Sequence, residues 1–515
     1  MIVQSWVSCE ISPTSSKDLR ARACCVCVSR MTEEILGQSD ESMLPWRRFD
    51  TVAICGMLAA SLVTHFWRLG VPNVLVYDEH IYVDEAYKFL RGESFFEVHP
   101  PLGIWLIAAC ARLFGCHAWS WRVGSAVIGT ALIPLTYLLA RRMFHSRGAA
   151  MLAALLLLCE GMFLQYSRLA LINIVYVTLG AAAYLALFRF TQSHDPADRR
   201  RSLVWMGVVL GLGLGSKFAI PVIAWLLVVG FLATSILPPL SRRKIPEGLS
   251  SWEPGYLFGA IALVGGISGV FFFLTFIPNY AVGWWSGISS LTTYYYHVLL
   301  ANRFYPKPIS HQDSPWWSWP LMLRSYKLWQ QPDDEGMYLA IWGGGNPAIW
   351  WAALVAIVVA GIRAVREGGA AWNFLSIGYL AYLAMFIPVD RAVYLYSYMP
   401  ALYLAILALA GLLDECWKGT ARVWEQGVLL LPVVAASLLG LGYLYGAIAS
   451  SLTLAGYITL LSRGTWPGRF VCAIFLATSI AVFLYFVPLW IPTPLTKGGL
   501  DARMWFNNAG LGNWI

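Results

Sequence analysis

The chain has 515 residues, of which 58% are hydrophobic and only 12% are charged. Ordinary soluble domains carry about 25% charged residues, and a soluble chain of this length would need polar surface for roughly three domains. The composition therefore excludes a soluble globular protein and predicts that lipid surrounds most of the chain. The formal charge of +8 is divided among short basic clusters between apolar runs, which argues against a nucleic-acid partner.

The first thirty residues lack the basic-then-apolar order of a signal peptide. Cys24, Cys25 and Cys27 stand close together, but no histidine lies near them to complete a metal site. Met31 precedes a polar stretch and is a candidate for the true start. We expect residues 1–45 to form a cytoplasmic tail.

Apolar runs long enough to cross a bilayer recur from about residue 50 to residue 491. About thirteen spans are predicted, or eleven if one hairpin does not cross. They lie near 50–67, 123–140, 148–166, 169–189, 202–215, 218–238, 256–278, 347–363, 371–388, 393–413, 427–444, 446–462 and 470–490.

The basic clusters predict the topology. With a cytoplasmic N-terminus, alternation of the spans places the clusters around 141–147, 199–201 and 242–244 inside, as the positive-inside rule requires. Two long segments, 70–122 and 279–346, then lie outside, and they are rich in polar and aromatic residues. We therefore expect the functional site on the outer face. The predicted regions are a tail (1–45), a catalytic membrane region (46–413) and a C-terminal membrane region with an outer tail (414–515).

The first outer segment contains an amphipathic helix that we expect to lie in the membrane interface. Its apolar positions follow helical spacing and are Val83, Ala86, Tyr87 and Leu90. Asp78 and Glu79 stand at its start, where the helix dipole favours carboxylates. They are either capping residues or functional carboxylates on the outer face.

Glu97 and His99 precede Pro100 and Pro101, which suit the first turn of another helix. Spacing alone leaves two alternatives open. The two polar side chains either cap that helix or face the same water-filled cavity as Asp78.

Four basic residues fall near outer span boundaries, namely Arg122, Arg168, Lys217 and Arg391. The positive-inside rule does not explain them, and ionisable groups at this depth usually face an internal cavity. One alternative is that they extend to lipid headgroups. The other is that they converge on a phosphate or pyrophosphate ligand.

Several segments, taken in order, resemble the protein O-mannosyltransferases, a family of the GT-C superfamily of membrane glycosyltransferases. The resemblance covers roughly 75–402. Its segments are DE at 78–79, EVHPPLG at 97–103, WRVGSAVIGTALIPLTY at 121–137, EGMFLQYSRLALIN at 160–173, GSKF at 215–218, SPWWSWPLMLR at 314–324, GNP at 345–347 and RAVYLYSYMPAL at 391–402.

The resemblance implies an all-α GT-C bundle that transfers mannose from a polyprenyl-phosphate or dolichyl-phosphate carrier to Ser or Thr hydroxyls of exported proteins. By carry-over, Asp78 is the catalytic base, Glu79 its essential neighbour and Arg122 a residue of the active-site cavity. We expect inversion by a single displacement, with no metal and no cofactor. The expected substrate-binding residues are Glu97, His99, Arg122, Arg168, Lys217, Arg391, Tyr398 and Trp317.

Four positions depart from the family pattern. The family usually has Asp at Glu97, Lys at Ile104, an acidic residue at Asn173 and His at Ser397. These departures, and the short second outer segment, suggest a bacterial-type member of the plasma membrane with its site on the extracytoplasmic face.

Two rival functions follow from the same residues. The first is a GT-C transferase whose acceptor is a lipid or a cell-surface glycan. The second is a transporter or flippase, which is disfavoured because transporters tend to have paired broken helices with charges at the membrane midplane. In this chain the polar residues are concentrated in one outer segment instead.

Overall fold

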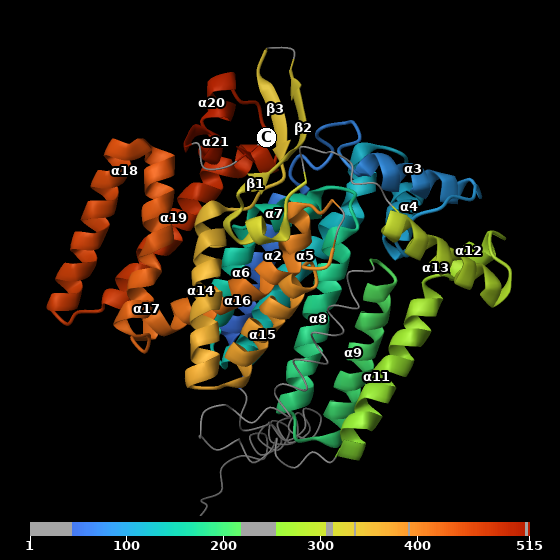
Figure 1. Cartoon of the computed structure of the whole chain (residues 1–515), viewed down its shortest axis with the longest axis horizontal. Coiled ribbons are helices and arrows are strands. Elements are labelled where there is room, and N and C mark those ends of the chain that lie inside the picture. Colours follow the sequence, from blue (N-terminus) through green and yellow to red (C-terminus); the bar gives the residue numbers. More distant parts are fainter. Residues whose placement is uncertain are drawn as a thin grey trace, which may run out of the picture. The chain divides into compact units, whose positions relative to one another are not determined.

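The computed structural model describes residues 44–217, 254–304, 313–333, 336–389, 392–509 and 513–514. Within these ranges the regular structure is mostly helical (Figure 1), and the predicted all-α membrane bundle is confirmed. The first half contains α2 (Arg48–Phe66), α3 (Glu79–Leu90), α4 (Leu102–Phe114), α5 (Ala118–Phe144), α6 (Arg147–Leu158), α7 (Gly161–Arg168), α8 (Asn173–Gln192), α9 (Pro196–Leu214), α11 (Pro254–Leu274), α12 (Ile277–Ala281) and α13 (Gly287–Phe304). The second half contains η1 (Trp316–Leu321), β1 (Arg324–Ser325), β2 (Lys327–Pro332), β3 (Tyr338–Trp342), α14 (Pro347–Arg366), α15 (Ala370–Ala384), η2 (Leu395–Tyr398), α16 (Met399–Lys418), α17 (Val423–Val428), α18 (Leu430–Ser462), α19 (Pro467–Trp490), α20 (Lys497–Asp501), α21 (Trp505–Ala509) and β4 (Asn513–Trp514).

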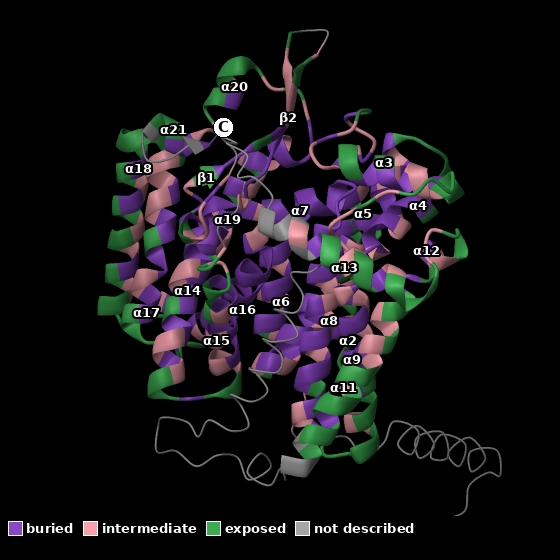
Figure 2. Ribbon diagram, turned by 45° about the vertical axis from the view of Figure 1, so that its right-hand side comes forward, coloured by how far each residue is buried: buried purple, intermediate pink, exposed green. Residues whose placement is uncertain are grey.

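The described helices are those of a multi-pass membrane protein. Eight of them are long and apolar enough to cross a bilayer, or nine when the bent pair α6–α7 counts as one span. Large apolar side chains such as Phe258 and Leu452 are exposed on α11 and α18, as expected for surfaces that face lipid. Figure 2 shows burial concentrated in the central helices, and nearly every residue of α16 is buried. The predicted span 218–238 lies outside the described residues.

The span predicted at 148–166 is broken, because a buried carboxylate ends it. Helices α6 and α7 meet at an angle of 59°. Glu160 lies at the break and accepts hydrogen bonds from the N–H groups of Met162 and Phe163, and it also accepts one from the N–H of Asn346. The carboxylate thus caps α7 and links it to the start of α14.

The spans predicted at 427–444 and 446–462 are the two arms of α18. Gly442 interrupts the helix with φ of 77°, a conformation that favours glycine. A Cβ placed on Gly446 would lie 2.5 Å from the carbonyl oxygen of Ser437. Residues nine apart in a straight helix cannot approach so closely, so the chain folds back at Gly442.

Basic residues of the predicted inner clusters are paired with acids at one end of the bundle. Asp50, at the start of α2, pairs with Arg141 at 3.2 Å and Arg147 at 3.0 Å. Lys418, at the end of α16, donates to the side chain of Ser146. Since Ser146 precedes Arg147, the ends of α2, α5 and α16 meet here.

The opposite end carries α3, α4, the strands and the C-terminal elements (Figure 1). Strands β2 and β3 form an antiparallel hairpin, and β1 pairs in parallel with β4 near the C-terminus. Trp514 of β4 is fully buried, its ring lies 4.8 Å from that of Trp342, and its Nε1 donates to the carbonyl of Met322. The sequence did not indicate these strands. They tie the predicted C-terminal region to the second outer segment.

Candidate active site

Asp78 lies directly before α3 with a partly buried side chain, and that side chain makes no capping hydrogen bond. The capping alternative is therefore wrong for this residue. Burial raises the pKa of Asp78 to about 6, a net value that includes a lowering by nearby Lys217 and a raising by Glu97. The three side chains consequently lie within electrostatic reach of one another. A carboxyl group with this pKa is mostly ionised at pH 7 and is well suited to accept a proton.

Glu79 points away from Asp78 and into the protein, where it forms a buried ion pair with Arg122. Glu79 Oε1 accepts from Arg122 Nε at 2.8 Å and Glu79 Oε2 from Arg122 Nη2 at 2.7 Å. The same carboxylate also accepts the backbone N–H groups of Val76 and Ala170. Both side chains of the ion pair are almost completely buried.

The remaining donors of Arg122 bind the chain that leads to Asp78. Nη1 donates to the carbonyls of Leu69 and Pro72, and Nη2 donates to that of Val74. An arginine has five N–H donors, and all five are thus used inside the protein. The expectation that Arg122 binds substrate is corrected: together with Glu79 it holds the 69–79 segment and so positions Asp78.

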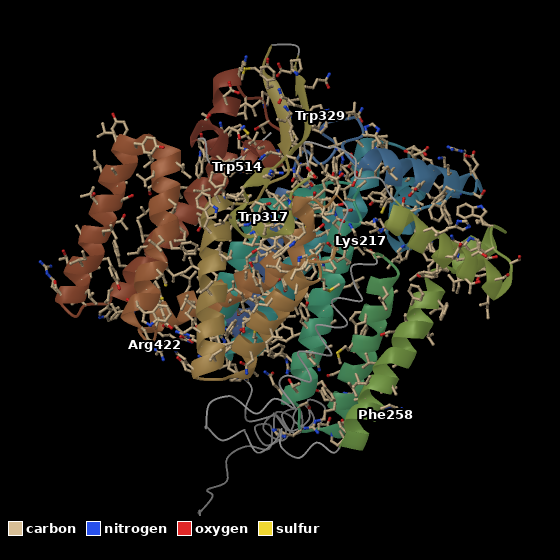
Figure 3. All side chains as sticks on the ribbon, viewed as in Figure 1. Lys217, Phe258, Trp317, Trp329, Arg422 and Trp514 are labelled. Carbon is tan, nitrogen blue, oxygen red and sulfur yellow. The ribbon has the colours of Figure 1, made fainter. Side chains whose placement is uncertain are left out.

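Lys217 follows α9 and is 8% exposed. Its Nζ donates to Asn173 Oδ1 at 2.8 Å and lies 4.7 Å from the ring centre of Tyr396. In Figure 3, Lys217 lies above Arg422 and Phe258, toward the end of the bundle that carries Trp329 and Trp514. Residue 173 is an amide here rather than the acid of the family pattern, so its contact with the ammonium group involves no negative charge.

A group of tyrosines surrounds Asp78 and Lys217, and sequence reasoning missed it. The rings of Tyr77 and Tyr326 are 5.5 Å apart, and the hydroxyls of Tyr326 and Tyr166 are 2.7 Å apart. Tyr166 in turn lies 5.8 Å from Tyr396. Burial raises the pKa of Tyr77, with Tyr326 and Asp78 adding to the effect, so these hydroxyls stay protonated and can donate hydrogen bonds.

Tyr396, rather than the predicted Tyr398, faces Lys217. Residues 395–398 form the 3-10 helix η2, in which neighbours two apart point in different directions. Tyr398 is fully buried, and its hydroxyl pairs with that of Tyr379 at 2.8 Å. The expected role of Tyr398 in substrate binding is corrected to core packing.

Glu97 and His99 lie beside the Asp78 region, and a buried glutamate accompanies them. Glu97 accepts the backbone N–H of His99 at 3.1 Å. The side chain of Glu85, which is 6% exposed, lies next to that of Glu97. Burial and the neighbouring Glu97 together raise the pKa of Glu85 to about 10, so Glu85 is protonated at neutral pH. The sequence could have indicated that Glu85 is buried, because it lies between Tyr82 and Ala86 on the buried face of α3.

Two further predicted residues, Arg168 and Trp317, do not reach this region. Arg168 donates to the carbonyls of Thr64 and His65 at 2.8 Å each, deep in the protein. Trp317 is 58% exposed on the surface, whereas its neighbour Trp319 is buried and donates to Ser314. Arg391 lies outside the described residues. Among the described residues, no group of three or more His, Cys, Asp or Glu could hold a metal ion.

An apolar groove of about 410 Å³ runs between α4, α5, α8 and α9, where Leu102, Trp105, Ile128 and Val175 are among its lining residues. The N–H of Leu102 donates to the carbonyl of Gly215, two residues before Lys217. The groove therefore begins near the cationic side of the site.

Comparison with known proteins identifies related sequences along most of the chain. The family models described as dolichyl-phosphate-mannose-protein mannosyltransferase match residues 57–118 and 98–252. A model of the C-terminal four-span region of protein-O-mannosyltransferase matches 298–509. The polyprenol-phosphate-mannose–protein mannosyltransferase of Mycolicibacterium smegmatis is 27% identical over 423 residues, which cover 70% of this chain and 81% of the relative. Human protein O-mannosyl-transferase 1 is 30% identical over 209 residues, which cover 35% of this chain and 27% of that protein.

Two solved structures share the fold. The protein O-mannosyltransferase Pmt1–Pmt2 complex of S. cerevisiae, bound to its sugar donor, aligns with a TM-score of 0.71 at 14% identity, covering 91% of this chain and 94% of the matched chain. ArnT from Cupriavidus metallidurans, bound to undecaprenyl phosphate, aligns with a TM-score of 0.53 at 18% identity, covering 85% and 78%. At these identities the likeness concerns the fold alone.

Proposed function

Because this chain belongs to the dolichyl-phosphate-mannose–protein mannosyltransferase family, we propose that it is a membrane glycosyltransferase that moves mannose from a polyprenyl-phosphate carrier to hydroxyl groups of polypeptides. The observation that supports this function most strongly is that the carboxylate of Asp78 lies within electrostatic reach of the buried ammonium group of Lys217. A transfer from a lipid phosphate to a hydroxyl needs both a base and a cation.

In the proposed reaction the hydroxyl oxygen of a Ser or Thr side chain attacks C1 of the sugar, and the bond between C1 and the phosphate oxygen breaks. Asp78 takes the hydroxyl proton as the new bond forms. The phosphate leaves with the electron pair of the broken bond, and Lys217 stabilises the charge that develops on it. One displacement of this kind inverts the configuration at C1. The apolar groove near Lys217 suits an isoprenoid chain.

The donor is tested by incubating the purified full-length chain with labelled polyprenyl-phosphate sugars and a peptide containing Ser and Thr. We expect product from the mannose donor and at least about tenfold less from its glucose epimer, since a site that hydrogen-bonds each sugar hydroxyl discriminates against the misplaced one. Preferential use of another sugar would replace mannose in this proposal. Lack of product from every donor would contradict the transfer itself.

We also propose that the site faces the outside of the plasma membrane. Arg141 and Arg147 of the predicted inner cluster 141–147 lie at the end of the bundle opposite α3, which supports this orientation. Single cysteines at the exposed positions Ser94 and Arg201, introduced into a cysteine-free background, test it. An impermeant maleimide should label position 94 in intact cells and position 201 only after permeabilisation. The reverse pattern would place the site on the cytoplasmic side.

A further inference from the structure

A cavity of about 360 Å³ lies between residues 95–104 and the helices α12 and α13. Polar and aromatic side chains from both segments line it, including Glu97, His99, Asn279, Trp285, Thr293 and Tyr294. We refer to it as the outer cavity. Glu97 and His99 thus belong to both the Asp78 region and this cavity.

The walls of the outer cavity are joined by hydrogen bonds between segments nearly 200 residues apart. The hydroxyl of Tyr294 donates to the carbonyl of His99 at 2.9 Å, and Nε1 of Trp284 donates to the carbonyl of Gly92 at 3.0 Å. On the far wall, the ring of Trp285 stacks on Phe276 with centres 5.2 Å apart. Such contacts hold a cavity in shape before any ligand arrives.

The cavity offers hydrogen-bond acceptors. Asn279 is 8% exposed, and within the described part of the chain its Oδ1 has no hydrogen-bond partner. A buried amide oxygen without a partner is costly, so a ligand that donates an N–H or O–H would stabilise it. The carboxylate of Glu97 is a second acceptor. Extended polypeptide offers such donors at regular intervals in its backbone N–H groups.

The outer cavity also lies beside the proposed base. The ring of His99 packs 6.5 Å from that of Tyr82, and the N–H of Tyr82 donates to the carbonyl of Asp78, one helical turn away. Lys217, the cation assigned to the leaving phosphate, is not among the residues lining the cavity. The contacts through His99 and Tyr82 therefore place the cavity near Asp78.

We propose that the outer cavity binds an extended segment of the acceptor polypeptide next to the hydroxyl that receives the sugar, and that Asn279 accepts a backbone N–H of that segment. This inference rests on the proposed transferase function and names the subsite that the acceptor occupies. It makes α12 and α13 one wall of the acceptor site.

The test compares two tryptophan substitutions on α13 in the full-length protein. Thr293→Trp fills the cavity, whereas Thr292→Trp adds the same bulk at the neighbouring exposed position, which does not line it. With polyprenyl-phosphate mannose and a Ser/Thr peptide as substrates, Thr293→Trp should raise the KM for the peptide by about tenfold or more. The KM for the donor should stay unchanged, and Thr292→Trp should behave as wild type. Asn279→Ala should raise the peptide KM by about fivefold, the effect of one lost hydrogen bond.

Two results would overturn the assignment. Equal peptide KM values for both tryptophan variants would mean that the acceptor does not bind in the cavity. A raised donor KM for Thr293→Trp alone would mean that the cavity binds the donor sugar instead. If the wild type transfers no mannose at all, the proposed function fails instead. Fluorescence anisotropy of a labelled peptide then separates the questions, because weaker peptide binding by Thr293→Trp than by Thr292→Trp would still support the peptide site, and equal binding would refute it.

Discussion

Replacing Asp78 with Asn should lower kcat by about 10²- to 10⁴-fold, the usual contribution of a positioned general base. The amide keeps the shape of the side chain but cannot take a proton from the acceptor hydroxyl. The melting temperature should stay close to that of the wild type, because Asp78 makes no capping hydrogen bond to α3. The KM for the donor should change little. Steady-state kinetics and a thermal-shift assay on the purified proteins measure all three.

The pH profile supplies a second measurement of the same role. Burial raises the pKa of Asp78 to about 6, and a base acts only when deprotonated. The wild-type rate should therefore fall about tenfold per unit as the pH drops below about 6. The residual activity of Asp78→Asn should lack this decline.

Asp84→Asn is the matched control, since Asp84 lies on the same helix but is exposed and paired with Lys88. It should retain the rate and the pH profile of the wild type. A wild-type rate for Asp78→Asn would mean that Glu97 or another carboxylate is the base. An equal loss for both variants would mean that α3, rather than one proton acceptor, was disturbed.

Arg122→Ala should destabilise the protein by about 3–5 kcal/mol, as expected when one partner of a buried ion pair is removed. The substitution leaves the carboxylate of Glu79 buried with neither of its guanidinium hydrogen bonds. It also releases the carbonyls of Leu69, Pro72 and Val74. Thermal unfolding in detergent should show a clear drop in melting temperature, and activity should be lost with it.

The comparison with Asp78→Asn separates positioning from catalysis. Arg122→Ala should lose stability and rate together, whereas Asp78→Asn should lose rate alone. Arg91→Ala removes an exposed ion pair with Glu93 and should leave the melting temperature nearly unchanged. A stable Arg122→Ala variant with a raised donor KM would mean that Arg122 binds the donor after all.

Hydropathy predicted an all-α membrane bundle, because a run of about twenty apolar residues is long enough to cross the bilayer and too apolar for a surface in water. It predicted eleven to thirteen spans, whereas eight or nine of the described helices are long and apolar enough to cross. The break between α6 and α7 was missed because Glu160 is a single carboxylate within an apolar run. Its effect depends on Asn346, nearly 190 residues away in the chain. The fold at Gly442 was anticipated only as a gap between two predicted spans.

Within the candidate site, sequence reasoning identified Asp78, Glu97, His99 and Lys217, which the structure brings into one region. It was wrong to assume that every basic residue near an outer boundary faces a ligand. Arg122 instead binds backbone carbonyls of the irregular segment before α3, and Arg168 binds carbonyls in the last turn of α2. Both sets of carbonyls need donors where water is scarce.

The tyrosines around Asp78 could not be predicted from the sequence in the same way. Tyr166 and Tyr326 are 160 residues apart and belong to unrelated elements, and tyrosines are common throughout the chain. Only the packing of α7 against the strand region selects them.

Mass spectrometry of the acceptor peptide tests the central claim most directly. Purified wild-type protein, incubated with polyprenyl-phosphate mannose and a Ser/Thr peptide, should add one hexose to a Ser or Thr hydroxyl, and Asp78→Asn should form this product at least about a hundredfold more slowly. Mannose found only in a lipid or glycan fraction, or equal peptide modification by the wild type and Asp78→Asn, would contradict the account.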